Sequence, residues 1–261
     1  MHRMSSPTGA GRRGRSRAGR IRGTVAAAAC AALLLGHAAA AQTLPERFDA
    51  TYVLSAQGID IGETRWTLRP HTGGRYVYES SSEAIGIARL LRDERIHERS
   101  EWRLAEGGGV QPLHYSYRRS GGKRDRVVDV EFDWSGGQVR NTLNGHSWSM
   151  SLESGMLDKL VYLLELMHDL SGSFQQARYA VADGGKVKTY VMTRVGEARV
   201  DTVMGSLDTV IVERRREGDE RVTRIWCAPR LRFLPVKVEH LERGETVQLS
   251  LKRLQGLTPA P

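Results

Sequence analysis

Cysteine is scarce in this sequence, which contains only Cys30 and Cys227. Cys30 lies in an N-terminal segment that has the features of a removable leader, so the mature chain keeps one thiol and cannot form an internal disulfide. Cys227 stands between Trp226 and Ala228, and these neighbours predict a buried, small apolar side chain. The stability of the mature chain must therefore come from packing.

Recognisable catalytic and metal-binding motifs are also lacking. His97 and Glu98 begin a zinc-protease pattern, but Glu101 stands where the second histidine is required. Ser120 and Lys123 have the spacing found in penicillin-recognising enzymes, but the two glycines between them predict a turn instead of the required helix. The other mature histidines are scattered singly along the chain. The sequence therefore predicts no catalytic residue, no metal site and no cofactor.

Acidic residues are absent from the first 41 residues, which contain seven arginines. An apolar stretch at residues 24–35 is followed by small residues up to Ala41, a combination typical of a secretory signal peptide. The stretch has about a dozen residues, fewer than the roughly 20 that span a bilayer. We predict that residues 1–41 are a signal peptide cleaved near Ala40 to Gln42. Residues 42–261 are then a single periplasmic domain that does not span the membrane.

The formal net charge of +9 belongs mostly to this leader. Without its seven arginines, 32 basic residues face 30 acidic ones. Nucleic-acid binding requires basic charge concentrated on one face. The run from Arg214 to Arg216 is instead followed at once by Glu217, Asp219 and Glu220. The sequence therefore predicts no nucleic-acid partner.

Glycine-containing turns divide the mature chain into short segments of alternating character. They lie at residues 73–74, 107–109, 121–122, 136–137, 144–145, 184–185 and 218–219, where positive φ angles favour hairpins. Between two of these turns, Val128, Val130 and Phe132 alternate with Asp129 and Glu131, which is the pattern of a half-buried strand. Many short strands at near-regular spacing predict an antiparallel meander.

Residues 154–170 have a helical period instead, with Ser154 as the expected cap and Gly172 just beyond the end. Aliphatic side chains cover well over half of the helix circumference. The remaining narrow stripe is polar and consists of Asp158, Tyr162, Glu165 and Asp169. A sheet must curve to cover so wide an apolar surface. The sequence thus predicts a mainly β fold, in which a strongly curved antiparallel sheet, an open β-barrel meander, encloses one central α-helix.

The five tryptophans have two interpretations that the sequence leaves open. They fill the core, or they line a pocket for an apolar ligand. For the second interpretation, the candidate ligand-binding residues are Trp134, Trp226, Leu160 and Leu164. They would border a groove between sheet and helix that receives a lipid acyl chain or a hydrophobic peptide.

A second apolar segment, residues 83–91, surrounds Gly86 with alanine, isoleucine and leucine. Two placements are open for it. The segment folds back over the mouth of the barrel, or it is presented to lipid or to an envelope protein partner.

Short motifs with a characteristic order and spacing extend over nearly the whole mature chain: Tyr52, Gly58-Ile59, Gly62, Val110-Gln111-Pro112-Leu113, Phe132-Asp133, Asp158, Leu160, Asp183-Gly184-Gly185-Lys186, Val203, Gly205, Trp226, Leu234-Pro235-Val236-Lys237 and Gly244. In these residues the chain resembles a bacterial envelope family, the domain of unknown function 3108. It departs from the family at Cys227-Ala228-Pro229, where a serine or an aspartate-bearing turn is usual. The resemblance implies a secreted or periplasmic β-rich domain and transfers no catalytic residue.

Three functions follow from these observations, and we favour the first. It is a non-enzymatic periplasmic protein of the cell envelope that binds a hydrophobic ligand beside the helix, as the outer-membrane lipoprotein carrier fold does, which the predicted fold resembles in outline. The second is a scaffold that docks an envelope protein on its strand edges or on residues 83–91. The third is a hydrolase of envelope components that uses Asp158 with a histidine, although a place at the start of the helix already gives Asp158 a structural role.

Overall fold

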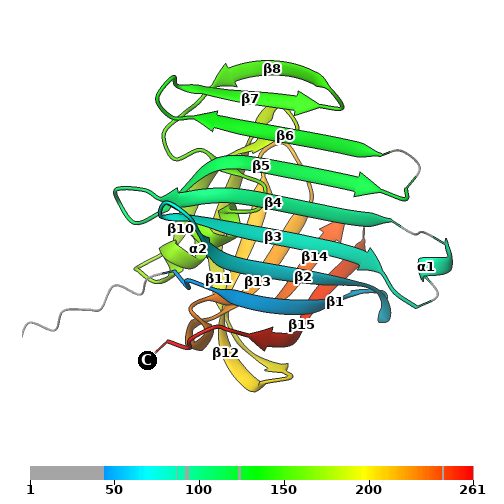
Figure 1. Ribbon diagram of the computed structural model, residues 1–261. Helices are drawn as coiled ribbons and strands as arrows, with labels where there is room; N and C mark the ends of the chain where they lie inside the picture. Colours follow the sequence, from blue (N-terminus) through cyan, green and yellow to red (C-terminus); the bar gives the residue numbers. More distant parts are fainter. Residues whose placement is uncertain (1–43, 87, 92–93, 123–124, 243, 261) are drawn as a thin grey trace, which may run out of the picture. The chain divides into compact units, whose positions relative to one another are not determined.

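The computed structural model describes residues 44–86, 88–91, 94–122, 125–242 and 244–260, and the predicted signal peptide lies outside them. Within these residues, fifteen strands form one sheet (Figure 1). The strands are β1 (Phe48–Ala56), β2 (Ile59–His71), β3 (Arg75–Ala84), β4 (Arg95–Leu104), β5 (Val110–Ser120), β6 (Arg126–Asp133), β7 (Gln138–Leu143), β8 (His146–Ser151), β9 (Leu157–Asp158), β10 (Gln176–Asp183), β11 (Lys186–Thr202), β12 (Gly205–Arg216), β13 (Val222–Ala228), β14 (Leu234–Glu242) and β15 (Glu245–Gln255). The helical segments are α1 (Ala88–Leu91), α2 (Tyr162–Leu170) and the 3-10 turn η1 (Pro229–Leu231).

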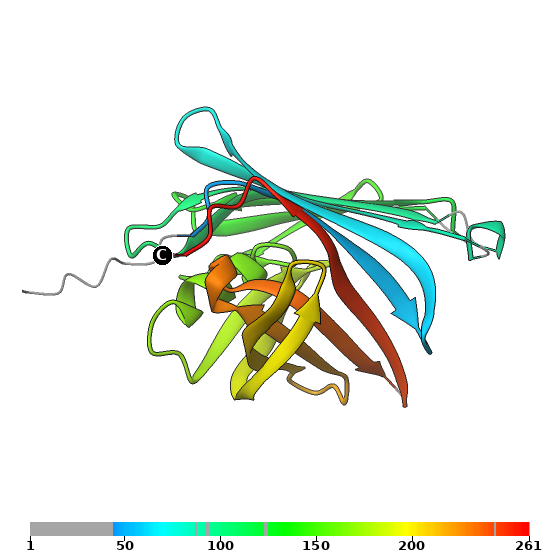
Figure 2. The same cartoon turned by 90° about the horizontal axis from the view of Figure 1, so that it is seen from below.

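The sheet is a meander whose two halves meet where β1 pairs with β15. From edge to edge the strand order is β8-β7-β6-β5-β4-β3-β2-β1-β15-β14-β13-β12-β11-β10-β9. The described strand pairs are antiparallel except for β9 with β10, which run parallel. Figure 2 shows that the sheet doubles over, with the cyan and green strands in one layer and the yellow and orange strands in the other. The predicted mainly β, strongly curved sheet is confirmed.

The local signals in the sequence correspond to observed turns and strands. Asn144-Gly145 joins β7 to β8, and Gly184-Gly185 joins β10 to β11, with positive φ angles at all four residues. In β6 the side chains of Val128, Val130 and Phe132 are buried while their neighbours are more exposed. The strand β6 therefore has one face toward the core, as the period of two predicts.

The predicted start of the central helix is wrong, whereas its predicted end is confirmed. The helix α2 begins at Tyr162 instead of residue 154, and the preceding residues 157–158 form β9. Asp158 is the reason. Its Oδ1 accepts hydrogen bonds from the backbone amides of Leu160 (2.7 Å) and Val161 (2.9 Å). Bonds from the amides two and three residues further on are the pattern of a helix N-cap, whose own backbone is not helical. Leu157 and Asp158 pair with β10, so the chain becomes helical only after Asp158.

The helix α2 is enclosed by the sheet, and its polar stripe is not a solvent-facing surface. Each of the four polar residues accepts a hydrogen bond from a different strand. The donors are Ser100 Oγ of β4 to Asp158 (2.5 Å), Arg214 Nη1 of β12 to Tyr162 (2.6 Å), the Val110 amide of β5 to Glu165 (2.6 Å) and the Tyr179 hydroxyl of β10 to Asp169 (2.6 Å). The stripe therefore ties the helix to both layers of the sheet.

Cys227 of β13 is fully buried, which confirms its prediction as a small core side chain. Burial raises the pKa of its thiol above the ordinary value. The thiol therefore stays protonated and out of reach of a second chain.

None of the described helices combines the length and the apolar character that crossing a bilayer requires.

Candidate functional site: a polar cleft

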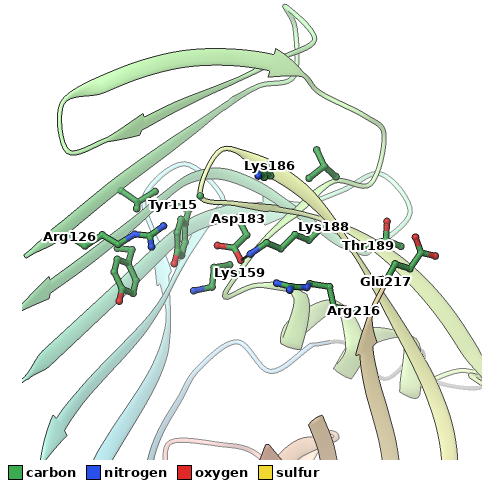
Figure 3. A pocket seen from close by; sticks show the side chains of 13 residues that line it. Tyr115, Arg126, Lys159, Asp183, Lys186, Lys188, Thr189, Arg216 and Glu217 are labelled. Carbon is green, nitrogen blue, oxygen red and sulfur yellow. Dashed lines mark hydrogen bonds and ion pairs between the residues drawn. The ribbon is translucent and has the colours of Figure 1, made fainter. Parts of the chain in front are cut away.

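A cleft of about 770 Å³ opens where the two ends of the sheet approach each other (Figure 3). One wall is formed by Tyr115 and Tyr117 of β5 and by Arg126 of β6. The opposite wall is formed by the turn and strand at residues 183–189 and by the end of β12. Lys159, which lies in the turn between β9 and α2, also lines the cleft. Segments far apart in the sequence therefore build one hollow.

The two ends of the sheet are joined beside this cleft by a contact between Trp148 of β8 and Gly185. The indole Nε1 of Trp148 donates a hydrogen bond to the Gly185 carbonyl oxygen (3.3 Å). A Cβ at residue 185 would overlap the indole ring, and the φ angle of +82° also favours glycine. Glycine at this position therefore lets β8 seat against the turn that carries the cleft residues.

We expect Gly185→Ala to detach Trp148 and to lower the free energy of unfolding by about 2 to 4 kcal/mol, because steric overlap adds to the cost of a left-handed backbone. Urea unfolding and the tryptophan emission maximum measure the two effects. Gly145→Ala is the matched control, since Gly145 has a φ of +88° with no atom near the added Cβ. It should cost about 1 kcal/mol. Equal losses in both variants would show that the indole contact contributes nothing.

Basic side chains predominate among the charged groups of the cleft, and most of them are paired. Lys188 forms an ion pair with the cleft carboxylate Asp183. Arg216 pairs with Asp219, and the second cleft carboxylate, Glu217, pairs with Arg178. Both carboxylates that line the cleft, Asp183 and Glu217, are therefore paired with basic side chains.

Tyr115 and Lys159 both contact the carboxylate of Glu98. The hydroxyl of Tyr115 donates a hydrogen bond to Glu98, and burial together with that carboxylate raises the pKa of Tyr115 well above its ordinary value. The hydroxyl therefore remains a donor. The Nζ of Lys159 lies 3.8 Å from Glu98 and 5.3 Å from the centre of the Tyr117 ring.

Asp158 directly precedes the cleft residue Lys159, but its contacts give it a structural role. Its side chain is fully buried, and burial raises its pKa to about 6 against the opposing effect of hydrogen bonds from Ser100, Val161 and Leu160. These described partners are a hydroxyl and two backbone amides, so the carboxylate joins β4 to the start of α2. The predicted hydrolase role requires a histidine beside Asp158, and none of these described partners is a histidine.

The raised pKa of Asp158 gives stability a defined pH dependence. Because the folded-state value of about 6 exceeds the ordinary value of 3.8, this contribution is fully present below about pH 4 and is lost as the pH rises through 6. Burial also raises the pKa of Glu165, which acts in the same direction. We expect the free energy of unfolding in urea to be about 2 kcal/mol higher at about pH 4.5 than at about pH 7.5.

The control for this pH dependence is Asp158→Asn, which cannot titrate. It should lose most of the change between about pH 4.5 and 7.5, keeping only the part that belongs to Glu165. Arginine lowers the pKa values of Asp49 and Glu101, so these carboxylates weaken the fold only as the pH falls below their ordinary values of 3.8 and 4.5. An unchanged pH slope in Asp158→Asn would contradict the assignment.

Among the described residues, the four predicted ligand-binding side chains do not surround one pocket, and only Trp226 lines one. Leu160 and Leu164 are buried in the core around α2, with exposed fractions of 4% and 0%. Trp226 lines a separate pocket of about 460 Å³, where the Lys237 Nζ lies 4.6 Å from the centre of its ring.

Trp134, the fourth predicted residue, packs on β5 and β6. Its ring stacks on Phe132 with a centre-to-centre distance of 6.4 Å, and its Nε1 donates a hydrogen bond to the Pro112 carbonyl (2.6 Å). Of the five tryptophans, Trp66, Trp102 and Trp226 are buried in the core. Core filling therefore accounts for most of them.

The residues of the cleft were missed because their sequence signals are weak. Arg126, Lys159 and Lys186 belong to three separate segments. The motif Asp183-Gly184-Gly185-Lys186 was the one local indication, and it predicted only a turn. Within the part of the chain that the structure describes, no group of three or more histidine, cysteine, aspartate or glutamate side chains is placed to hold a metal ion.

Together, the doubled-over meander and its enclosed helix define a barrel-like β protein. The sequence matches the model of the family described as a protein of unknown function, DUF3108, over residues 47–251. The chain therefore belongs to this family, as its motifs predict.

A solved structure supports the same fold. The chain is similar to the crystal structure of a beta-barrel-like protein of domain of unknown function DUF1849 from Brucella abortus, with a TM-score of 0.55 and 9% sequence identity. The similarity covers 81% of this chain and 98% of that chain. At this identity it shows the fold alone. Among curated proteins, none matches the sequence.

Proposed function

We propose that the protein is a non-enzymatic binding protein of the bacterial periplasm, whose ligand lies in the polar cleft between β5–β6 and β10–β12. The observation that carries this proposal is the cleft itself. Its volume of about 770 Å³ lies in the range of small-molecule sites, roughly 300 to 1,000 Å³. Its walls come from both ends of the sheet, so a ligand there contacts both layers at once.

Two further observations support the proposal. The arginine-rich, acid-free segment before residue 42 is typical of export, with cleavage near Ala40 to Gln42. In the cleft, the carboxylates Asp183 and Glu217 are held in ion pairs with basic side chains. Paired charges and tyrosines suit recognition of a polar ligand, whereas nucleophilic catalysis requires a base beside an activated nucleophile.

Native mass spectrometry of protein gently purified from the periplasmic fraction tests this proposal. The wild-type protein should retain a small molecule, and Thr189→Trp should lose it, because Thr189 lines the cleft and an indole there fills the hollow. Thr246→Trp is the control at an exposed position of β15. Retention of the same molecule by Thr189→Trp, or recovery of the wild-type protein from the cytoplasm with its leader attached, would refute the proposal.

The hydrophobic ligand predicted beside Leu160 and Leu164 is a second candidate. Both side chains are buried against the sheet, so an acyl chain would have to replace α2 in the core. The hydrogen bonds that tie α2 to three strands, and the bond from Ser100 that holds Asp158 just before it, oppose this displacement. For that reason the proposal places the ligand in the polar cleft.

A pocket beside α1 favours docking of an envelope protein partner as a third candidate. The pocket has a volume of about 410 Å³ and is lined by Leu54, Ile61, Ala84 and Ile96 among others. Glu83 and Ala88 of the apolar segment at residues 83–91 line it as well, and Ile87 of that segment falls outside the described residues. Cross-linking in cells tests this candidate, since a specific cross-linked partner should be lost in Ile96→Asp.

A further inference from the structure

The cleft contains more positive than negative charge, and this excess indicates what the ligand carries. Five basic side chains line it from separate segments: Arg126 of β6, Lys159 before α2, Lys186 and Lys188 of β11, and Arg216 of β12. Two carboxylates line it with them, those of Asp183 and Glu217. A hollow with such a balance attracts anions.

The excess is concentrated on particular side chains. Lys188 and Arg216 each have a carboxylate partner, Asp183 and Asp219 respectively. Among the residues that the structure describes, neither Arg126 nor Lys186 forms an ion pair with a carboxylate. Lys159 is intermediate, because its Nζ lies 3.8 Å from Glu98 and over the ring of Tyr117. Arg126 and Lys186 are therefore available to a ligand, and Lys159 is a third cation, whose long contact with Glu98 a ligand would share.

These cations approach the same hollow from different directions. Arg126 reaches from β6 to the opposite wall, where its Nη2 would lie 2.9 Å from a Cβ added to Gly184. Figure 3 shows the side chains of Arg126 and Lys186 on different sides of the cleft, with Lys159 on a third side near Tyr115. Glycine at residue 184 leaves the space that the guanidinium occupies. A group placed between these side chains would meet these three cations and also the carboxylate of Asp183, whose charge Lys188 offsets.

We propose that the cleft binds the phosphate group of a larger ligand, with Arg126, Lys159 and Lys186 as the phosphate-binding side chains. This proposal rests on the proposed function and names the chemistry of its ligand. A carboxylate is satisfied by one bidentate guanidinium, whereas a tetrahedral phosphate has enough oxygens and charge for several cations on separate walls. The volume of about 770 Å³ is far more than one phosphate fills, so the group belongs to a larger molecule.

Binding of defined probes to the full mature chain tests the phosphate proposal. The probes are inorganic phosphate and glycerol 3-phosphate in calorimetric titrations, and vesicles of phosphatidylglycerol or of phosphatidylcholine in co-sedimentation. The wild-type protein should bind inorganic phosphate, glycerol 3-phosphate or the phosphatidylglycerol vesicles, more weakly as salt increases. Binding of the soluble probes alone identifies a soluble phosphorylated ligand, and binding of phosphatidylglycerol vesicles alone identifies a lipid headgroup.

The variant that tests the named residues is Arg126→Gln/Lys186→Gln. Its dissociation constant for the bound probe should rise by about tenfold or more, because two charge-assisted contacts are removed. The control is Arg47→Gln/Arg89→Gln, which removes the same net charge at two exposed positions that do not line the cleft. It should bind like the wild type. Absence of binding to every probe, or equal weakening in both double variants, would overturn the phosphate proposal.

Failure of this inference can be told apart from failure of the proposed function. A co-purified molecule without phosphate that is lost in Thr189→Trp but kept in Arg126→Gln/Lys186→Gln would refute the phosphate group and leave the cleft as the binding site. A molecule kept in both variants would refute the cleft itself.

Discussion

Replacing Asp158 with alanine should lower the free energy of unfolding by about 3 to 5 kcal/mol, because the change leaves several buried polar groups without partners. In the folded protein the carboxylate accepts hydrogen bonds from Ser100 and from the amides of Leu160 and Val161. Each unsatisfied buried group costs about 1 to 3 kcal/mol. Urea unfolding at about pH 7 measures the loss, with circular dichroism reporting the strands.

Asp158→Asn separates hydrogen bonding from charge at the same position. An amide oxygen can accept from the two backbone groups while the amide nitrogen donates to the Ser100 hydroxyl. Because burial raises the pKa of Asp158 to about 6, ionisation at neutral pH destabilises the wild-type fold, and asparagine avoids it. We expect Asp158→Asn to be at least as stable as the wild type at about pH 7. A loss in Asp158→Asn as large as that in Asp158→Ala would contradict this account.

Leu164→Ala should also destabilise the protein strongly, by about 2 to 5 kcal/mol, since Leu164 of α2 has no exposed surface and its truncation leaves a cavity. Val203→Ala is the control on an exposed side chain, 63% exposed, and should change stability by less than about 0.5 kcal/mol. Thermal and urea unfolding of the two variants give the comparison. A small loss in Leu164→Ala would mean that the sheet around α2 collapses easily, or that the helix is loosely held.

The same variant tests the apolar ligand predicted from the sequence. If the space between helix and sheet accepts an acyl chain, the cavity in Leu164→Ala should bind a fatty acid, which raises the melting temperature in proportion to occupancy. A melting temperature that fatty acid leaves unchanged, in both the variant and the wild type, would refute a ligand site beside α2. The polar cleft is independent of this outcome.

The strands could be predicted from the sequence because their signals are local. Val128, Val130 and Phe132 of β6 alternate with polar residues whatever the rest of the chain does, and glycine pairs mark turns through their own backbone freedom. The enclosed helix followed from the width of its apolar surface. These features gave the fold class without any knowledge of strand order.

The features that were missed depend on contacts between distant residues. The start of α2 is set by Asp158, whose partner Ser100 lies 58 residues away. The cleft depends on Arg126 reaching across to Gly184, and on Trp148 seating against Gly185. The periodicity of apolar residues shows which face of a strand is buried, but not which distant side chains it contacts in the folded sheet. A single sequence therefore predicts the strands of this sheet better than the cleft that they form.

Strands β1 and β15 are neighbours in the middle of the sheet, with Asp49 opposite Gln255 and the Tyr52 hydroxyl donating to the Pro235 carbonyl (2.8 Å). Such high contact order makes folding slow. Of the two partners of β1, β2 is made next but β15 is made last, so one edge of β1 stays unpaired until the chain is complete. Until β15 pairs with it, this edge can pair with another copy of the chain, so slow closure of the sheet favours aggregation during folding.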